Sequence, residues 1–498
     1  MQFLWHDYET FGTRPPVDRP CQFAAQRTDA DLKPLGDPVV IYCAPAGDVL
    51  PHPAACLITG ITPQEAIRKG RVESEFAVEI NHLMSEPGTC SAGFNSLRFD
   101  DEVTRHLLYR NLLDPYEREW KHGNSRWDLI NLARMCYALR PDGLEWPTAE
   151  DAGEHEAADH SISGANPRPS FRLQDLAAAN GIEHHDAHDA LADVRATIDL
   201  ASLIRRAQPK LFEWALSMRD KQTARKLLDP KRLTPVVHTS GRFSSRRGCT
   251  AVVLPLAHHP QNDKAVIVFD LMGDAESLAG SDSLSIRDRV FTPASDLPDD
   301  VARLPLKAVK WNAVPMLAPV SVLGGVDHDR IGLDMNRCQH NLTLLIDNIE
   351  SIQRSVREAF SLDFEDAEVD PDLALYRGGF FDDADRRLME AIHRCNPAEL
   401  AGKEWAFRDP RLPTMLLRYR ARNWPDTLSQ TDWEAWQKDR RFRLMQPAGS
   451  DFFGFEAFEQ ELAVARKELS RDERSQAILD MLEAWGEELA LDANISEL

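Results

Sequence analysis

The stretch that most constrains the fold lies at the start of the chain, where Phe3-Leu4-Trp5-His6-Asp7-Tyr8-Glu9-Thr10-Phe11-Gly12 combines apolar and aromatic residues with a closing glycine. This pattern predicts a β-strand that runs into a tight turn. Because side chains at i and i+2 of a strand point to the same face, Asp7 and Glu9 lie side by side. Two such carboxylates repel each other unless a cation lies between them, and Mg²⁺ prefers oxygen ligands of this kind. A lone D-x-E also occurs on many surface strands, so the pair needs support from the rest of the chain.

Two later segments supply that support. Asn95-Ser96-Leu97-Arg98-Phe99-Asp100-Asp101 precedes a predicted helix, and Ala187-His188-Asp189-Ala190-Leu191-Ala192-Asp193 contains the start of another. In chain order the motifs are D-x-E, N-x-x-x-F-D and H-D-A-x-x-D, which resembles the pattern of the DEDD exonucleases in the subgroup that has a histidine. Four acidic residues and one histidine match the five positions of that pattern: Asp7, Glu9, Asp100, Asp193 and His188.

The resemblance narrows to bacterial exonuclease I. The segments that carry it are spread over nearly the whole chain: His6–Gly12, Leu57–Glu65, Asn124–Asp128, Ser240–Phe243 and Tyr419–Asn423. It implies an α/β RNase H-like exonuclease domain with a mixed sheet, followed by an SH3-like β-barrel domain and an α-helical C-terminal domain. We place the domain boundaries at residues 1–208, 209–359 (which includes a connector helix) and 360–498.

Length and composition agree with a multidomain globular protein. The chain of 498 residues is too long for a single hydrophobic core. Its content of 43% hydrophobic and 28% charged residues is ordinary for a soluble protein. No apolar run approaches a bilayer span and no signal-peptide pattern is present, so we expect a cytoplasmic protein. The eight cysteines stand singly, without a C-x-x-C pair, which favours reduced thiols over zinc ribbons or disulfides. The net charge of −22 disfavours broad coating of duplex DNA and weakly favours an enclosed channel for a single strand.

Hydrophobic periodicity divides the chain into three regions. The first alternates expected strands (3–7, 22–27, 39–43, 90–94) with expected helices (63–69, 73–84, 101–111, 127–138, 171–180, 189–206), and a helical connector over 209–228 follows it. The second has short β runs at 236–238, 251–256, 265–269 and 306–310. The third, from about residue 336, is helical, with clear patterns at 381–395, 412–422, 433–443, 455–469 and 475–489.

Several polar segments have two interpretations. Asp101 and Asp189 are near the motif acids, but capping or solvation is their simplest role, and Asp189 is a plausible N-cap. Residues 147–169 form an acidic, histidine-bearing loop for which a solvated insertion is favoured over a second metal site. The loop Ser240–Gly248 suits a single strand or an exposed hairpin tip equally well. Arg418, Arg420, Arg422 and the 438–443 cluster suit a phosphate track, or more commonly the solvated faces of amphipathic helices.

The motif residues suggest a two-metal hydrolase. Two divalent ions about 4 Å apart activate a water and neutralise the phosphate and the leaving oxygen. We expect Asp7, Glu9 and Asp193 as direct ligands with Asp7 bridging, and Asp100 as a ligand to the second ion through water. His188, with an ordinary pKa near 6.5, suits the general base that takes a proton from the attacking water. We expect two Mg²⁺ ions, with Mn²⁺ as a substitute.

The family resemblance implies the reaction and its substrate: 3′→5′ removal of 5′-mononucleotides from single-stranded DNA with a free 3′ end, in DNA repair and recombination. Arg172 matches a position that contacts the terminal nucleotide, and Glu9, Thr10 and Phe11 are candidates to hold the last sugar and base. A further basic and aromatic series suits stacking and phosphate contact. Its members are Arg105, Tyr116, Trp120 and Arg134.

The resemblance also implies a protein partner, the acidic and apolar C-terminal tail of single-strand DNA-binding protein. A pocket flanked by basic residues would bind such a tail. Arg140 and Arg330 lie in matching segments, whereas Thr234 and Gly324 stand where a basic residue is expected. We expect a monomer that makes no membrane contact.

Two other functions stay open at this point. The first is a DEDD enzyme that degrades RNA or proofreads for a polymerase, against which the large β and α regions after the nuclease domain argue. The second is a non-catalytic scaffold that binds single strands. The full acidic set argues against the scaffold, because clustered carboxylates without metal would destabilise the domain.

Overall fold

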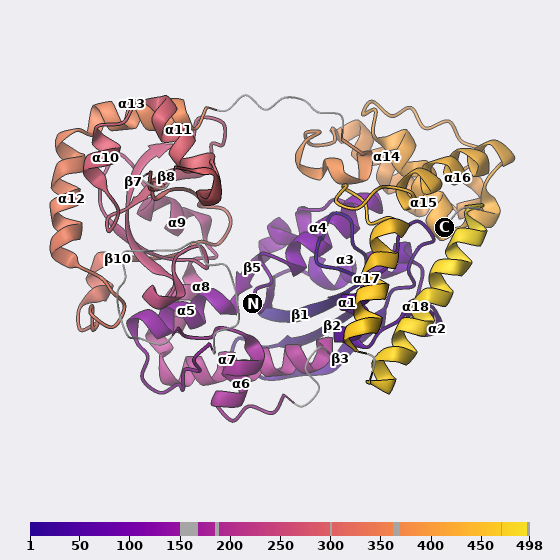
Figure 1. The fold of residues 1–498 in the computed structure, drawn as a ribbon, viewed down its shortest axis with the longest axis horizontal. Helices are drawn as coiled ribbons and strands as arrows, with labels where there is room; N and C mark the ends of the chain where they lie inside the picture. The colour runs from indigo at the N-terminus through magenta and orange to yellow at the C-terminus, as the bar shows by residue number, and fades with distance from the viewer. Residues whose placement is uncertain (150–167, 185–188, 299–300, 362–368, 470, 496–498) are drawn as a thin grey trace. The chain divides into compact units, whose positions relative to one another are not determined.

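The computed structural model describes residues 1–149, 168–184, 189–298, 301–361, 369–469 and 471–495 (Figure 1). The chain forms two compact units, one made of residues 1–125, 185–195 and 367–498, the other of residues 126–184 and 196–366. Within the described part of the chain, no helix combines the length and the apolar character needed to cross a membrane.

The first unit is built on a mixed sheet, as the sequence predicts. Its strands are β1 (Gln2–Thr10), β2 (Pro20–Thr28), β3 (Pro34–Tyr42) and β4 (Thr89–Gly93), in the order β3-β2-β1-β4. β1 pairs antiparallel with β2 and parallel with β4, and β2 pairs antiparallel with β3. The fifth strand, β5 (Ser125–Asp128), contains the boundary between the two units.

Alternation along β1 separates an apolar face from an acidic one. Leu4 and Tyr8 belong to a buried cluster that includes Phe23 of β2 and side chains of α3 (Glu73–Ser85) and α4 (Asp100–Arg110). Asp7 and Glu9 alternate with these residues and therefore lie on the opposite face of the sheet. The remaining helices of this region are α1 (Pro53–Thr59) and α2 (Pro63–Lys69), and the Thr62 side chain caps α2 by accepting from the Glu65 backbone N–H.

The C-terminal part of this unit is helical, also as predicted. It contains α14 (Asp383–Arg394), α15 (Leu412–Asn423), α16 (Gln430–Leu444), α17 (Phe455–Glu468) and α18 (Glu473–Asp492). One core cluster joins Phe11 and Cys56 to Leu444, Phe458 and Leu482. Figure 1 shows α17 and α18, in yellow, beside α1. The helices α16, α17 and α18 thus share a hydrophobic core with the turn after β1.

Both interpretations are wrong for Arg418, Arg420, Arg422 and Arg443, whereas Lys438 of the 438–443 cluster is exposed, as on a solvated face. Arg418, Arg422 and Arg443 are buried, and each forms ion pairs with aspartates. Arg420 is also buried and pairs with Asp432. The sequence does not reveal this burial, because most of the partner acids lie on other elements than the arginines that they contact.

The second unit contains the antiparallel β region. Its sheet has the order β10-β6-β7-β8-β9, from β6 (Val236–Thr239), β7 (Thr250–His258), β8 (Ala265–Asp270), β9 (Leu306–Lys310) and β10 (Met316–Pro319). Its helices are α5 (Leu129–Leu139), α6 (Leu173–Ala179), α8 (Pro209–Ser217), α9 (Lys221–Leu227), α10 (Ala275–Ala279), α11 (Ser283–Phe291), α12 (Met335–Asp347) and α13 (Ile349–Ala359). The helix α7 (Ala190–Ala207) begins in the first unit and continues into the second.

The loop Ser240–Gly248 is anchored to this sheet. Phe243 packs against the core cluster, with the Lys307 ammonium 4.6 Å from its ring centroid. Arg247 is buried and donates to Asp270 at 2.6 Å. The aromatic ring and one of the three arginines in this loop therefore have structural contacts. Most of the acidic loop 147–169 lies outside the described residues.

Candidate metal and nuclease site

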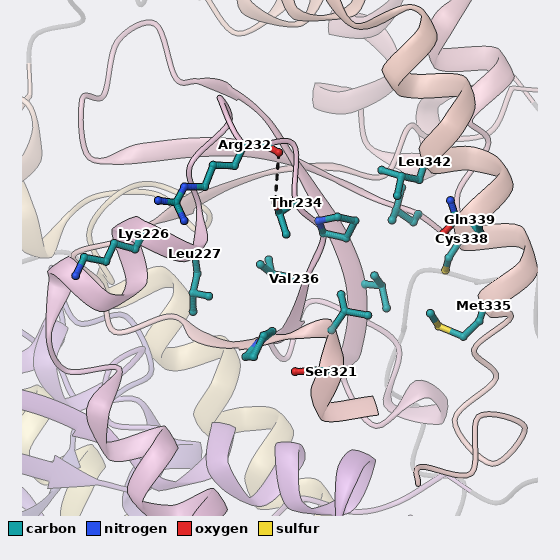
Figure 2. Close-up of a pocket in the computed structure, with 15 residues that line it drawn as sticks. Lys226, Leu227, Arg232, Thr234, Val236, Ser321, Met335, Cys338, Gln339 and Leu342 are labelled. Atoms are coloured by element: carbon teal, nitrogen blue, oxygen red, sulfur yellow. Dashed lines mark hydrogen bonds between the residues drawn. The ribbon is translucent and has the colours of Figure 1, made fainter. Parts of the chain in front are cut away.

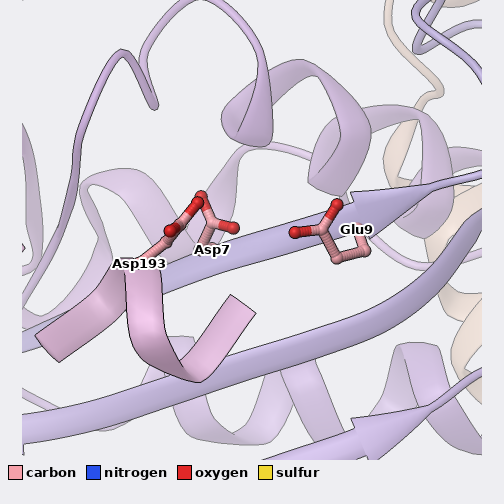
Figure 3. Close-up of side chains that lie close together, drawn as sticks. All are labelled: Asp7, Glu9 and Asp193. Carbon is pink, nitrogen blue, oxygen red and sulfur yellow. The ribbon is translucent and has the colours of Figure 1, made fainter. Parts of the chain in front are cut away.

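Three carboxylates meet on the acidic face of the first sheet. Figure 3 shows Asp7 and Glu9 projecting from β1, and Asp193 reaching toward them from the first turn of α7. One oxygen of each carboxylate lies within 4.8 Å of the others. The strand supplies two of these groups because their i, i+2 spacing places them on one face, and the helix start supplies the third across a large sequence separation.

Burial and mutual repulsion make this cluster unfavourable without a cation. Burial is the main cause that raises the pKa of Asp7 well above its usual range, and the charges of Asp100 and Asp193 add to the effect. Burial, with repulsion from the same two aspartates, raises the pKa of Glu9 to about 9. The cluster therefore fits a hard divalent cation, because such a cation accepts oxygen ligands and stabilises the charged form of all three groups.

Asp100 lies next to this group at the start of α4. Its side chain is buried, and its Oδ1 accepts a hydrogen bond from the Tyr8 backbone N–H at 3.1 Å. Tyr8 separates Asp7 from Glu9, so this bond fixes Asp100 to the strand that carries both of them. Asp100 is outside the three-carboxylate set, but its charge acts on Asp7 and Glu9.

The two neighbouring acids have different roles. Asp101 is buried and forms an ion pair with Arg118 at 2.8 Å, so the prediction of capping or solvation is wrong for Asp101. Asp189 does cap its helix, because its Oδ2 accepts from the Ala192 backbone N–H at 3.2 Å. His188, the predicted base, lies outside the described residues.

Comparisons with known proteins agree with this geometry. Family models match as "Exonuclease" over residues 4–201, "Exonuclease I SH3-like domain" over 219–362 and "Exonuclease I C-terminal domain" over 369–489. Exodeoxyribonuclease I of Escherichia coli (strain K12) is 44% identical over 492 residues, covering 98% of each chain. The chain belongs to the exonuclease I family.

Solved structures of the exonuclease I family have the same architecture. E. coli exonuclease I in complex with a dA16 oligonucleotide matches with a TM-score of 0.91 at 43% identity, covering 98% of this chain and 99% of that one. The zinc-bound form of the E. coli exonuclease I–single-stranded DNA complex matches with a TM-score of 0.90 at 43% identity and the same coverage. The predicted family and fold class are therefore confirmed.

In this exonuclease I family member, the predicted strand-contacting residues of the first unit lie in different surroundings. Arg105 donates to both oxygens of Glu119, at 2.7 and 3.0 Å, and to Glu102 at 2.6 Å. The half-buried Tyr116 lies under the Arg105 guanidinium, whereas Trp120 is 62% exposed. Trp120 thus offers an open ring, and Arg105 has carboxylate partners that a phosphate would have to replace.

Thr10 and Phe11 lie where β1 ends. The Thr10 hydroxyl donates to the Gly12 carbonyl at 2.5 Å, and Phe11 is 3% exposed within the core cluster that includes α17 and α18. These contacts fix the backbone next to Glu9. The ring of Phe11 has little surface left for a base.

The predicted contact residues of the second unit are distributed over several elements. Arg134 of α5 donates to Asn131 at 3.1 Å and lies 5.8 Å from the centroid of the Phe171 ring. Arg172 is exposed and precedes α6 as its N-cap residue. Arg140 donates to the carbonyls of Val322 and Gly324, and Arg330 donates to those of Tyr137 and Ala138. Arg140 and Arg330 thus connect α5 to the loops around residues 322–324 and around Arg330, in addition to carrying charge.

Proposed function

We propose that this chain is a Mg²⁺-dependent 3′→5′ exonuclease that degrades single-stranded DNA to 5′-mononucleotides. The observation that carries the proposal is the meeting of Asp7, Glu9 and Asp193 within 4.8 Å in a member of the exonuclease I family. Solved structures of E. coli exonuclease I include a complex with a dA16 oligonucleotide and a zinc-ion-bound form of a complex with single-stranded DNA. A role in DNA repair and recombination, in the cytoplasm, belongs to the same proposal.

In this proposal, Asp7, Glu9 and Asp193 hold a divalent cation, and Asp100 supports a second one. A pair of bound cations supplies an activated water and neutralises charge on the phosphate and leaving oxygen. The protein's own contribution is to fix the carboxylates on a rigid strand and a helix start, and His188 takes the proton released by the attacking nucleophile. Mn²⁺ replaces Mg²⁺ because both accept carboxylate and water oxygens.

The experiment that tests this proposal uses matched DNA and RNA oligonucleotides of one sequence, with and without Mg²⁺. We expect degradation of single-stranded DNA only, since the 2′-hydroxyl distinguishes the two substrates. Preferential degradation of RNA would favour an exoribonuclease instead. Tight strand binding with no degradation in either Mg²⁺ or Mn²⁺ would favour the non-catalytic scaffold.

We also propose that the chain acts as a monomer with three domains, 1–208, 209–359 and 360–498. Family models over 4–201, 219–362 and 369–489 support this division. Limited proteolysis near residues 208 and 360, with mass analysis of the fragments and light scattering of the intact chain, tests both parts.

A protein partner completes the proposal: the acidic, apolar tail of single-strand DNA-binding protein docks on the second unit. Figure 2 shows a pocket there, with Lys226 and Arg232 at one end. The pocket has a volume of about 480 Å³ and apolar walls that include Val236 and Leu342. Apolar walls beside two cations fit an acidic tail with apolar residues. Val320 and Ser321 also line this pocket. They belong to the segment Val320–Leu323, in which the Val322 carbonyl accepts a hydrogen bond from Arg140.

Binding of a labelled tail peptide to single-residue variants tests the partner and its site. We expect Lys226→Ala and Arg232→Ala to weaken binding if the pocket receives the tail. Loss of binding only in Arg140→Lys and Arg330→Lys would place the tail at those arginines. No binding to the wild-type chain would rule out the partner.

A further inference from the structure

The acidic face of the sheet also carries a polar residue directly beside Glu9, Gln22 of β2. In the antiparallel pairing of β1 with β2, Gln22 lies directly opposite Glu9, and Ala24 lies opposite Asp7. Residues directly opposite each other in a sheet project from the same face. Gln22 is 1% exposed, so its amide is held in a buried position next to Glu9.

The same residue is fixed from the third strand. Gln22 is also paired with Tyr42 of β3, and its Nε2 donates to the Tyr42 hydroxyl at 2.9 Å. Glu9, Gln22 and Tyr42 therefore form one row across three strands. A buried amide with a hydrogen bond to a neighbouring strand has little rotational freedom.

The other bonds of the Gln22 amide go to the start of α7. Its Nε2 lies 3.4 Å from Asp189 Oδ1, and its Oε1 accepts from the Ala190 backbone N–H at 3.3 Å. The second oxygen of Asp189 caps the helix at Ala192. One side chain thus contacts both the cap residue and the first residue of α7, which carries Asp193 in its first turn.

We propose that Gln22 is a positioning residue that sets the distance between the Asp7–Glu9 strand and Asp193. The Gln22 amide thus ties the start of α7 to the strand pair that carries Asp7 and Glu9, across the gap in which the carboxylates repel one another. Catalytic groups held loosely by about 1 Å lose about 10²-fold in rate. The inference rests on the proposed function, since its effect is on metal-dependent cleavage.

The test compares Gln22→Leu with the matched control Gln26→Leu. Gln26 is also buried on β2, four residues further along the same face, but its amide donates to carbonyls of Arg27, Leu35 and Gly36. We expect Gln22→Leu to lower kcat about 10- to 100-fold and to raise the Mg²⁺ concentration for half-maximal rate. KM for the strand, and strand binding in chelator, should stay within about 2-fold. Gln26→Leu should keep the wild-type kcat.

A polarity swap gives a second readout if Gln22→Leu does not fold. Gln22→Glu places a carboxylate against Asp189 and should lose activity. Adding Asp189→Asn restores a donor opposite the new acceptor and keeps a good N-cap, so the double variant should recover at least 10-fold over Gln22→Glu. Additive losses, or a folded Gln22→Leu with wild-type kcat and Mg²⁺ dependence, would overturn the inference. An inactive wild-type chain would instead overturn the proposed function.

Discussion

Arg422 donates two hydrogen bonds to a single oxygen of Asp48, from Nε at 3.0 Å and Nη2 at 2.8 Å, although 374 residues separate them in the chain. The same oxygen accepts from Arg443 at 2.7 Å and lies 3.6 Å from Arg19. All four side chains are almost fully buried. Asp48 thus joins the loop after β3 to the C-terminal helices α15 and α16.

Replacement of Asp48 is therefore expected to destabilise the first unit strongly. Asp48→Ala leaves three buried guanidinium groups with less negative charge around them, and loss of one partner of a buried ion pair costs about 3–5 kcal/mol. Denaturant unfolding followed by tryptophan fluorescence measures the change. The exposed pair Lys121–Glu117 offers a control, since Glu117→Ala should cost less than about 1 kcal/mol.

The low pKa of Asp48 in the folded protein predicts that the protein loses stability in acid. The arginine neighbours of Asp48 hold this pKa well below its usual range, with Arg422 contributing most. A group with a lowered folded-state pKa contributes stability that is present above its unfolded pKa of about 3.9 and lost as pH falls below it. The free energy of unfolding should fall below about pH 4 in the wild type, and this fall should be smaller in Asp48→Asn. Equal acid sensitivity of the two proteins would contradict the prediction.

The metal site predicts the opposite pH dependence in the metal-free protein. The pKa of Glu9 is raised to about 9, mainly by burial, and that of Asp7 is also raised. The folded state then binds more protons than the unfolded state, so stability falls as pH rises from about 4.5 to about 9. Since Mg²⁺ replaces these protons, the increase in Tm between chelator and Mg²⁺ should be larger at pH 8.5 than at pH 6.5. Glu9→Gln should raise the metal-free Tm at pH 8.5 and abolish most of the increase.

His188 should set the pH dependence of the reaction. His188→Ala is expected to slow cleavage about 10²–10⁴-fold and to remove the rise in rate that follows deprotonation of an imidazole near pH 6.5. Single-turnover rates from pH 5.5 to 9 measure both effects. A wild-type rate that is constant over this range would exclude His188 as the base.

The resemblance to the exonuclease I family implied the fold class, and hydrophobic periodicity located many of its elements because periodicity is local. Apolar spacing and the closing Gly12 mark β1, and apolar spacing after an N-cap marks the helix that carries Asp193. The elements that hold these acidic residues could therefore be predicted from the sequence. Short elements were missed: α1 has only seven residues, and β10 ends in Pro319, which weakens a strand pattern. The predicted helix at 127–138 begins at Leu129 because Ser125–Asp128 is a strand.

Long-range polar contacts could not be predicted from the sequence. Arg418, Arg422 and Arg443 suggested an exposed face, because nothing local reveals that Asp48, Asp370 and Asp372 surround them. Asp101 was misassigned for the same reason, since its partner Arg118 lies on another element. Gln22 was missed because its place beside Glu9 depends on strand register, and no motif encodes register.

The central claim is that Asp7, Glu9 and Asp193 hold catalytic metal on one face of the sheet, and Asp193→Asn tests it most directly. A 5′-labelled single strand of DNA is incubated with wild-type and variant chains in Mg²⁺, and strand binding is measured in chelator. The account predicts a ladder shortened from the 3′ end for the wild type only, with equal strand binding by both chains. Undiminished shortening by Asp193→Asn, or by the wild type in chelator, would contradict the claim.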